Sequence, residues 1–235
     1  MTGEHTQFKH ANLNSFLDKY LNHKPEEEHH KKILIVRHGQ SYGNLRQLWY
    51  GITNYELTPK GIEQAKNMRN ALAPLVKQVD NVFASELKRA QQTAKIIFDL
   101  DYPLEDLKDG YKSTRHHQTF TIDKRFNEYD LGGLENIDVS QLTFAEHEFI
   151  NRLHLEGKFV RDDIEQPSQV LQRATAGLRD LDGSKNNVLV AHYGLLHVLL
   201  NNMGYFGMHI DTGDCLHIDV DQDGYPHELK GYWAK

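Results

Sequence analysis

The sequence predicts an α/β fold: a three-layer sandwich with a mostly parallel mixed sheet flanked by helices. Apolar, strand-like runs alternate with amphipathic helical patterns along most of the chain. Two of the runs, at 33–37 and 187–191, end in a histidine that is followed within two positions by glycine. Alternating residues on both sides of Asp223-Gly224 are typical of a hairpin, which indicates an antiparallel addition near one sheet edge.

The first half of the chain supplies two strands and two helices to this arrangement. The strand at 33–37 holds four branched apolar residues, and Gly39 marks a sharp turn beyond it. Thr58 and Pro59 predict the start of a helix, because threonine caps helices and proline fits the first helical position. Residues 81–85 form a short strand, and its last residue, Ser85, is expected to cap the next helix.

The second half is less regular before it returns to a strand and a helix. Residues 100–120 are polar and indicate an exposed loop, or else a lid that carries cations toward a second anionic group. Helical patterns follow at roughly 138–155 and 167–182, after which the strand at 187–191 leads into a helix that opens at Gly194. The possible lid cations are Lys108, Lys112, Arg115, His116 and His117.

The length fits one domain with a polar extension before it. At 235 residues and 27.2 kDa, the chain suits a single well-buried domain, which we place at 33–235. Residues 1–32 are polar and rich in His, Glu and Lys. Within them Phe16, Leu17 and Tyr20 have helical spacing, so this N-terminal extension, or lid, is expected to contain one short amphipathic helix.

Composition limits the classes of partner. With 27 basic against 33 acidic residues and a net charge of −6, the chain has no overall basic field for nucleic acid or an anionic membrane. The single cysteine, Cys215, excludes an intramolecular disulfide and fits a reducing compartment. No secretory signal or long apolar run is visible, so we expect a cytoplasmic protein.

The segments that carry the candidate catalytic residues are expected to meet at one edge of the sheet. A phosphoryl group in transfer spreads negative charge over three oxygens, so catalysis needs several cations, an in-line nucleophile and an acid for the leaving oxygen. Any one of these residues alone is more often structural, and only their combination is informative. The residues that supply the set are Arg37, His38, Arg89, Glu128 and His192.

At these positions the chain resembles the histidine phosphatase superfamily, also called phosphoglycerate mutase-like. The resemblance runs in the family's order from residue 33 to about 194. It rests on five motifs: Arg37-His38-Gly39, LTPKGIEQA at 57–65, SELKRAQQTA at 85–94, NEYDLGGLEN at 127–136 and VLVAHYG at 188–194.

The resemblance implies a phosphohistidine mechanism that uses no metal and no cofactor. His38 would be the nucleophile, Glu128 the proton donor and acceptor, and Arg37, Arg89 and His192 the groups that hold the phosphoryl oxygens. The substrate would be a small phosphate ester and one product inorganic phosphate. The expected substrate-binding residues are Ser41, Asn44, Gly51 and Tyr193.

Three functions stay open at this point. A phosphatase is favoured over a phosphoglycerate mutase, because the stretch of 192 − 128 = 64 positions between Glu128 and His192 shows no long insertion of the kind that cofactor-dependent mutases carry. The third alternative is a non-catalytic phosphate-binding relative. Asn54 stands where many relatives have an aspartate, which puts a second substrate contact in doubt, and the substrate and the oligomeric state are left open.

Overall fold

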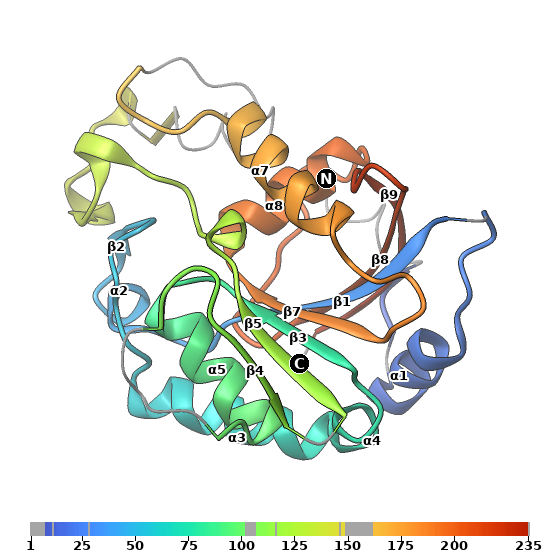
Figure 1. The fold of residues 1–235 in the computed structure, drawn as a ribbon. Coiled ribbons are helices and arrows are strands. Elements are labelled where there is room, and N and C mark those ends of the chain that lie inside the picture. Colours follow the sequence, from blue (N-terminus) through green and yellow to red (C-terminus); the bar gives the residue numbers. More distant parts are fainter. Residues whose placement is uncertain are drawn as a thin grey trace.

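A computed structural model describes residues 8–10, 12–27, 29–101, 107–115, 117–145, 147–148 and 162–234. Its main sheet has seven strands: β1 (Lys31–Arg37), β3 (Asn81–Ala84), β4 (Lys112–Arg115), β5 (Gln118–Ile122), β7 (Asn187–Ala191), β8 (Cys215–Val220) and β9 (Pro226–Trp233). They lie in the order β4-β5-β3-β7-β1-β8-β9 (Figure 1). A second, two-stranded sheet pairs β2 (Leu48–Trp49) with β6 (Ile137–Asp138).

The centre of the main sheet is parallel and its edges are antiparallel. Strands β5, β3, β7 and β1 run in one direction, while β4 on one side and β8 on the other run against them. Strand β9 follows β8 as the expected antiparallel hairpin. The predicted mixed sheet is therefore confirmed, including the hairpin at one edge.

Helices cover both faces of this sheet, as Figure 1 shows. On β1, Ile33 and Ile35 pack into one core cluster with α7 and α8, whereas Leu34 and Val36 pack into the other with α1, α3, α4 and α5. The alternation of side chains along a strand thus produces the predicted three layers. The helices are α1 (Leu13–Asn22), α2 (Tyr42–Leu45), α3 (Pro59–Ala71), α4 (Ala73–Val76), α5 (Lys88–Phe98), α7 (Pro167–Arg179) and α8 (Tyr193–Asn202), with 3₁₀ turns η2 (Lys124–Phe126), η3 (Gly132–Leu134) and η4 (Val139–Gln141).

The two predicted helix starts have different outcomes. Thr58 caps α3 as expected, since its Oγ1 accepts a hydrogen bond from Gly61 N at 3.0 Å. The prediction that Ser85 caps α5 is wrong, because α5 begins only at Lys88. Asn54 takes that part instead, and its Oδ1 accepts from Lys88 N at 2.7 Å.

Two other segments differ from expectation. Residues 112–115 form the edge strand β4, which pairs with β5, and so are neither a loop nor a lid. Residues 137–141 form β6 and a 3₁₀ turn, so the helix expected at 138–155 is wrong where it begins, whereas 144–145 and 147–148 are helical as expected. The rest of that interval from 149 lies outside the described residues, as do 102–106 and His116.

Helix α1 confirms the short helix expected in the N-terminal extension. Phe16, Leu17 and Tyr20 are buried in the core, and the Tyr20 hydroxyl donates to the Asn187 carbonyl at 2.8 Å. The helix is thus packed against the same core as the sheet, while the division into an extension and one catalytic domain stays a prediction. Across the described ranges, no helix has the length and apolarity to cross a membrane.

Candidate active site

The carboxyl ends of β1 and β7 bring the two motif histidines together. The ring centroids of His38 and His192 lie 5.1 Å apart, and His38 N donates to the Ala191 carbonyl at 3.0 Å. A cavity of about 210 Å³ opens beside them. Its lining residues are Arg37, His38, Asn44, Leu48, Trp49, Tyr50, Arg89, Glu128, Tyr129, Leu131, Tyr193 and Gly194.

His38 has one ring nitrogen held by the backbone. Its Nδ1 lies 2.7 Å from the Gly39 carbonyl oxygen, which only accepts hydrogen bonds, so we assign the proton of the neutral ring to Nδ1. Burial, followed by the charges of Arg89 and Arg37, lowers the pKa of His38 well below its usual value. The ring is therefore neutral near pH 7, and its Nε2 is the unprotonated, nucleophilic nitrogen.

Arg89 is buried at the centre of the site and anchored on three sides. It is 1% exposed, its Nε donates to His192 Nδ1 at 3.2 Å, and its two terminal nitrogens donate to Thr53 O at 2.9 Å and Gly51 O at 2.6 Å. A guanidinium has five N–H groups, so two remain for an anion in the cavity. The Tyr50 ring lies 4.8 Å from the Arg89 guanidinium carbon and supports it further.

Arg37 supplies a second cation with a free donor. Its Nη1 donates to the Ile210 carbonyl, and its guanidinium carbon lies 4.7 Å from the Tyr193 ring centroid. Its Nε is buried and has no hydrogen-bond partner among the described residues. The buried guanidinium of Arg89 and the partly buried one of Arg37, against the carboxylate of Glu128 among the described lining residues, make this cavity electropositive, which suits an anion.

Glu128 lies at the start of α8, where helix amides are free. Its carboxylate accepts from Gly194 N at 2.8 Å, Leu195 N at 3.1 Å and Tyr129 N at 3.0 Å. The positive end of the helix dipole adds to these bonds. The structure thereby fixes a carboxylate on the cavity wall, beside the anion site.

His192 is fully buried between two partners. Arg89 Nε can only donate, so His192 Nδ1 is the acceptor, and the neutral ring donates from Nε2 to Ser85 Oγ at 2.6 Å. Burial and the charge of Arg89 lower the pKa of His192 well below its usual value. Sequence reasoning missed this role of Ser85, because no local pattern records a contact with a residue 107 positions further along the chain.

The four expected substrate-binding residues divide into two pairs. Asn44 and Tyr193 line the cavity. Ser41 does not, because its side chain and that of Asn44 form the capping box that starts α2. Gly51 does not either: its carbonyl holds Arg89, and a Cβ there would lie 1.8 Å from the Tyr129 carbonyl oxygen, so this close approach requires glycine.

Glu135 organises the loop that holds Arg89. Its carboxylate accepts from the amides of Gly51, Ile52 and Thr53 at 2.9–3.2 Å, and from Leu131 N at 3.2 Å. The sequence placed Glu135 in the family motif but gave no reason for it. The structure supplies one, because the carbonyls of the same loop orient the guanidinium.

Replacing Glu135 by alanine is expected to lower the free energy of unfolding by about 2–3 kcal/mol, because several loop amides lose a charged acceptor. Urea unfolding of the variant measures this change. The control is Glu63→Ala, at an exposed position of α3, for which a change within about 0.5 kcal/mol is expected. Equal stability of both variants would contradict this role of Glu135.

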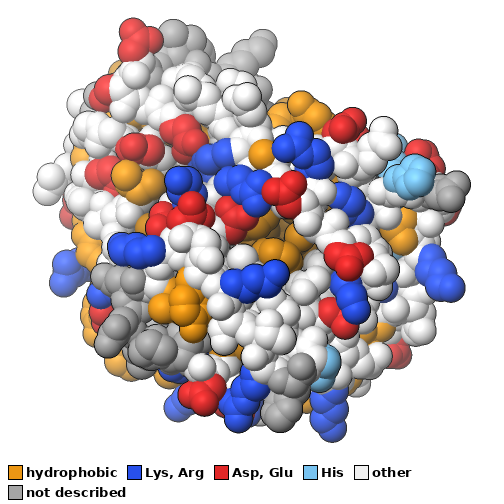
Figure 2. All heavy atoms as spheres, viewed as in Figure 1, with side chains coloured by type: hydrophobic (Ala, Val, Ile, Leu, Met, Phe, Trp, Pro, Cys, Tyr) orange, Lys and Arg blue, Asp and Glu red, His pale blue; other side chains and the backbone are white. Residues whose placement is uncertain are grey.

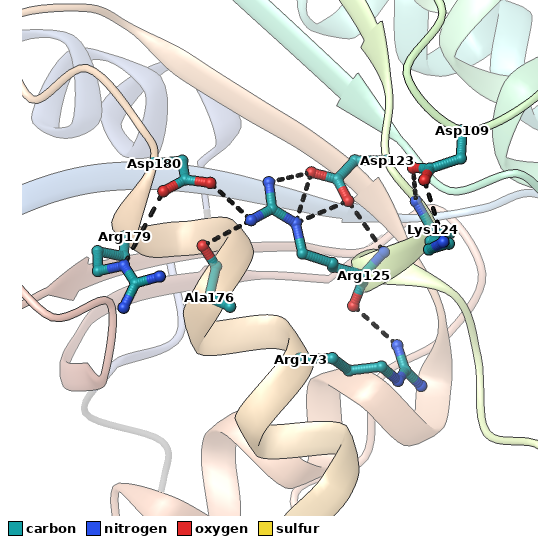
Figure 3. Close-up of polar contacts among 8 residues, drawn as sticks. All are labelled: Asp109, Asp123, Lys124, Arg125, Arg173, Ala176, Arg179 and Asp180. Carbon is teal, nitrogen blue, oxygen red and sulfur yellow. Dashed lines mark hydrogen bonds and ion pairs between the residues drawn. The ribbon is translucent and has the colours of Figure 1, made fainter.

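A second polar network fixes the segment that carries Glu128. Arg173 donates to the carbonyls of Arg125, Asn127 and Glu128 at 2.6–3.1 Å and pairs with Glu165 at 2.6 Å. Figure 3 shows Arg125 of this network enclosed by Asp123 and Asp180, and also bonded to the Ala176 carbonyl. Each arginine of this network pairs with carboxylates, which is typical of structural ion pairing. Figure 2 shows basic and acidic side chains interspersed over one face of the molecule.

The two buried histidines predict acid sensitivity. An unfolded chain protonates histidine below a pH of about 6.5, whereas folded His38 and His192 have lowered pKa values and stay neutral. Protons therefore favour unfolding, and stability that is complete above pH 6.5 is lost as the pH falls. Together the two histidines change the free energy of unfolding by at most about 3 kcal/mol per pH unit.

Urea unfolding between pH 7.5 and 5.0 measures this slope. The variant His38→Gln cannot take up the proton, so we expect it to lose about half of the pair's contribution. A slope identical to that of the wild type would refute the assignment of His38 as a buried neutral ring.

Comparison with known proteins gives a consistent picture. The family model of the histidine phosphatase superfamily (branch 1) matches residues 33–109 and 111–222. The chain is 24% identical to adenosylcobalamin/alpha-ribazole phosphatase of Escherichia coli (strain K12) over 204 residues, which cover 81% of this chain and 91% of that protein.

A second relative is a bisphosphoglycerate-dependent phosphoglycerate mutase of Rhizobium rhizogenes, 42% identical over 87 residues. That match covers 36% of this chain and 41% of the mutase. Among solved structures, phosphoglycerate mutase from Thermus thermophilus is similar with a TM-score of 0.63 and 24% identity. The match covers 87% of this chain and 99% of that one, and supports the fold alone.

Proposed function

Because the chain belongs to the histidine phosphatase superfamily, we propose that it hydrolyses a small phosphate ester through a phosphohistidine on His38. One observation carries the proposal: a neutral buried imidazole lies in a cavity with the buried Arg89 and the partly buried Arg37, and the Nε of Arg37 has no partner among the residues described. Such a site needs a bound anion to balance its positive charge and to accept the hydrogen bond of the unpaired donor. The guanidinium groups of Arg37 and Arg89 would provide the charge that a metal ion provides elsewhere.

The first half-reaction would transfer the phosphoryl group to the enzyme. His38 Nε2 attacks phosphorus in line, the bond from phosphorus to the ester oxygen breaks, and Glu128, which enters this step as the protonated acid, delivers its proton to the departing oxygen. In the second half-reaction water attacks phosphorus, gives a proton to Glu128, and breaks the P–N bond. Inorganic phosphate leaves and His38 returns to its starting form.

The cavity supports a small substrate. Its volume of about 210 Å³ is below the range of about 300–1,000 Å³ usual for drug-sized ligands. Besides the charged groups, Trp49, Tyr50 and Tyr193 line it, and aromatic faces of this kind suit an ester with an apolar or planar portion. Similarity to a phosphatase over 81% of this chain and 91% of that protein supports hydrolysis, and a cytoplasmic location remains part of the proposal.

A mutase is the second candidate, because one segment of the chain is 42% identical to a phosphoglycerate mutase. A mutase would retain the phosphoryl group and return it to a second hydroxyl of the same metabolite. The 64 positions from Glu128 to His192 show no long insertion to enclose a bisphosphate. We therefore rank hydrolysis first.

The test is hydrolysis of an aryl phosphate by the chelator-treated protein, with detection of acid-labile phosphohistidine after rapid quenching. Turnover and a stoichiometric phosphoprotein are expected without added metal. Interconversion of phosphoglycerates that requires priming by a bisphosphate would replace the proposal with the mutase. Binding of phosphate without turnover or phosphoprotein would favour a non-catalytic relative.

A further inference from the structure

A second cluster of titratable side chains lies far from the cavity, where α1 meets the sheet. His217 and Asp219 stand two residues apart on β8 and so share one face of the strand. In the strand register they lie beside Leu34 and Lys32, near the start of β1, whereas the catalytic cavity is at its end. His23, the residue directly after α1, reaches them, and its Nε2 lies 2.7 Å from Asp219 Oδ2.

This cluster is buried and its hydrogen bonds are incomplete. His217 is 0% exposed and Asp219 is 2% exposed. Within the described part of the chain, both ring nitrogens of His217 and the Oδ1 of Asp219 are buried without a hydrogen-bond partner. Buried polar groups are rarely left unsatisfied, so three such atoms in one place indicate a missing occupant.

The neighbouring lysines do not fill this place. Lys230 Nζ lies 3.8 Å from Asp219 Oδ2, but it donates to Glu228 at 2.5 Å. Lys32 Nζ donates to the carbonyls of Tyr20 and Leu21 at 2.9 and 3.0 Å. Both ammonium groups therefore have acceptors of their own, and His217 Nε2 lies 3.8 Å from Asp219 Oδ1, beyond hydrogen-bond distance.

We propose that His23, His217 and Asp219 bind a divalent transition-metal ion, Zn²⁺ first among them. Each residue offers one ligand atom, and these atoms lie within 4.8 Å of one another. Two ligands of a tetrahedral zinc lie about 3.4 Å apart, given bonds of about 2.0–2.1 Å. The ion would therefore replace the hydrogen bond of 2.7 Å between His23 and Asp219 by separating these two groups slightly, while the His217 ring at 3.8 Å moves slightly closer, with water as fourth ligand. Two imidazoles disfavour Ca²⁺ and Mg²⁺, which prefer oxygen ligands.

The position of the cluster indicates what the ion would do. His23 precedes the span 33–222 that matches the family model, while both other ligands belong to that span. The rings of Tyr20 and His23 flank His217 at centroid distances of 5.0 and 4.9 Å, so the imidazole is already oriented. The ion would fasten the end of α1 to β8 and stabilise the packed extension without taking part in hydrolysis.

The experiment uses the full chain, freed of metal with a chelator and titrated with Zn²⁺. We expect one equivalent to bind, a Co²⁺-loaded sample to show visible absorption of tetrahedral cobalt, and the Tm to rise by roughly 5–10 °C when Zn²⁺ is 100 times the Kd. Phosphate ester hydrolysis should not depend on this ion. Absence of binding, or binding without a rise in Tm, would overturn the proposal.

Variants of the three proposed ligands test whether the ion binds at this cluster. His23→Gln, at a partly exposed position outside the strands, should weaken Zn²⁺ binding at least tenfold and reduce the rise in Tm by about half or more, as should Asp219→Asn if it folds. The matched control is His209→Gln, since His209 is exposed and pairs with Asp211 at 3.2 Å. Unchanged Zn²⁺ binding in His23→Gln would refute the site. So would loss of Zn²⁺ binding in His227→Gln, which changes the second candidate cluster, Glu27, His30 and His227.

Discussion

Replacement of His38 by alanine is expected to lower kcat/KM for any substrate ester by at least about 10⁴-fold and to abolish the phosphoprotein. The imidazole forms the covalent bond between the enzyme and phosphorus in the proposed reaction, and its Nε2 is made available by the Gly39 carbonyl on Nδ1. Because the side chain is buried and neutral, its removal costs no ion pair. Circular dichroism should therefore show an intact fold.

The control for this variant is His209→Ala, which changes an exposed histidine outside the cavity and should retain full activity. Phosphate binding offers a further measurement, because Arg37 and Arg89 remain in the His38 variant. If His38→Ala hydrolysed esters at the wild-type rate, the phosphohistidine mechanism would be wrong whatever the substrate.

Replacement of Arg89 by lysine is expected to lower kcat/KM by about 10²–10³-fold, the range found when one charge-stabilising donor is removed. The guanidinium bonds to His192, Thr53 and Gly51 in three directions and keeps two further N–H groups for the cavity. An ammonium group cannot hold that geometry, so lysine preserves charge without preserving position. The loss should appear mainly in kcat if the phosphoryl oxygens are bound more tightly in the transition state.

The matched control is Arg69→Lys on α3, where the arginine is exposed and pairs with Asp99. That pair lies at the surface, and surface pairs contribute little, so near wild-type kinetics are expected. Wild-type kcat/KM in Arg89→Lys would show that charge alone suffices and would remove the positional argument.

Much of the fold could be predicted because its signals are local. Apolar runs gave β1 and β7 nearly to their ends, and Thr58-Pro59 gave the start of α3, since capping depends on neighbouring residues only. The error at Ser85 has a tertiary cause. Its hydroxyl serves His192, which lies 107 positions further along the chain, and no local pattern records that contact.

The candidate site shows the same division. The order of the motifs predicted that His38, Arg89 and Glu128 lie at one edge of the sheet, because parallel strands end at the same edge. The orientation of each side chain was not predictable, because it depends on backbone groups that are distant in the sequence. Gly51 and Ser41 illustrate the limit: both were expected to bind substrate, yet the Gly51 carbonyl bonds Arg89 and the Ser41 side chain caps α2. Position along the chain was predictable, and hydrogen-bond partners were not.

The pairing of β1 has a consequence for the motions of this site. The strand is bonded by β7 on one side and β8 on the other, and both of its faces are covered, so it belongs to the part of a protein that opens last. The loop at 51–53 is held by bonds to Glu135 and Arg89, so it is tied to the same rigid frame. The nucleophile and the arginine are therefore in place before an ester enters, and binding costs little conformational entropy in the protein.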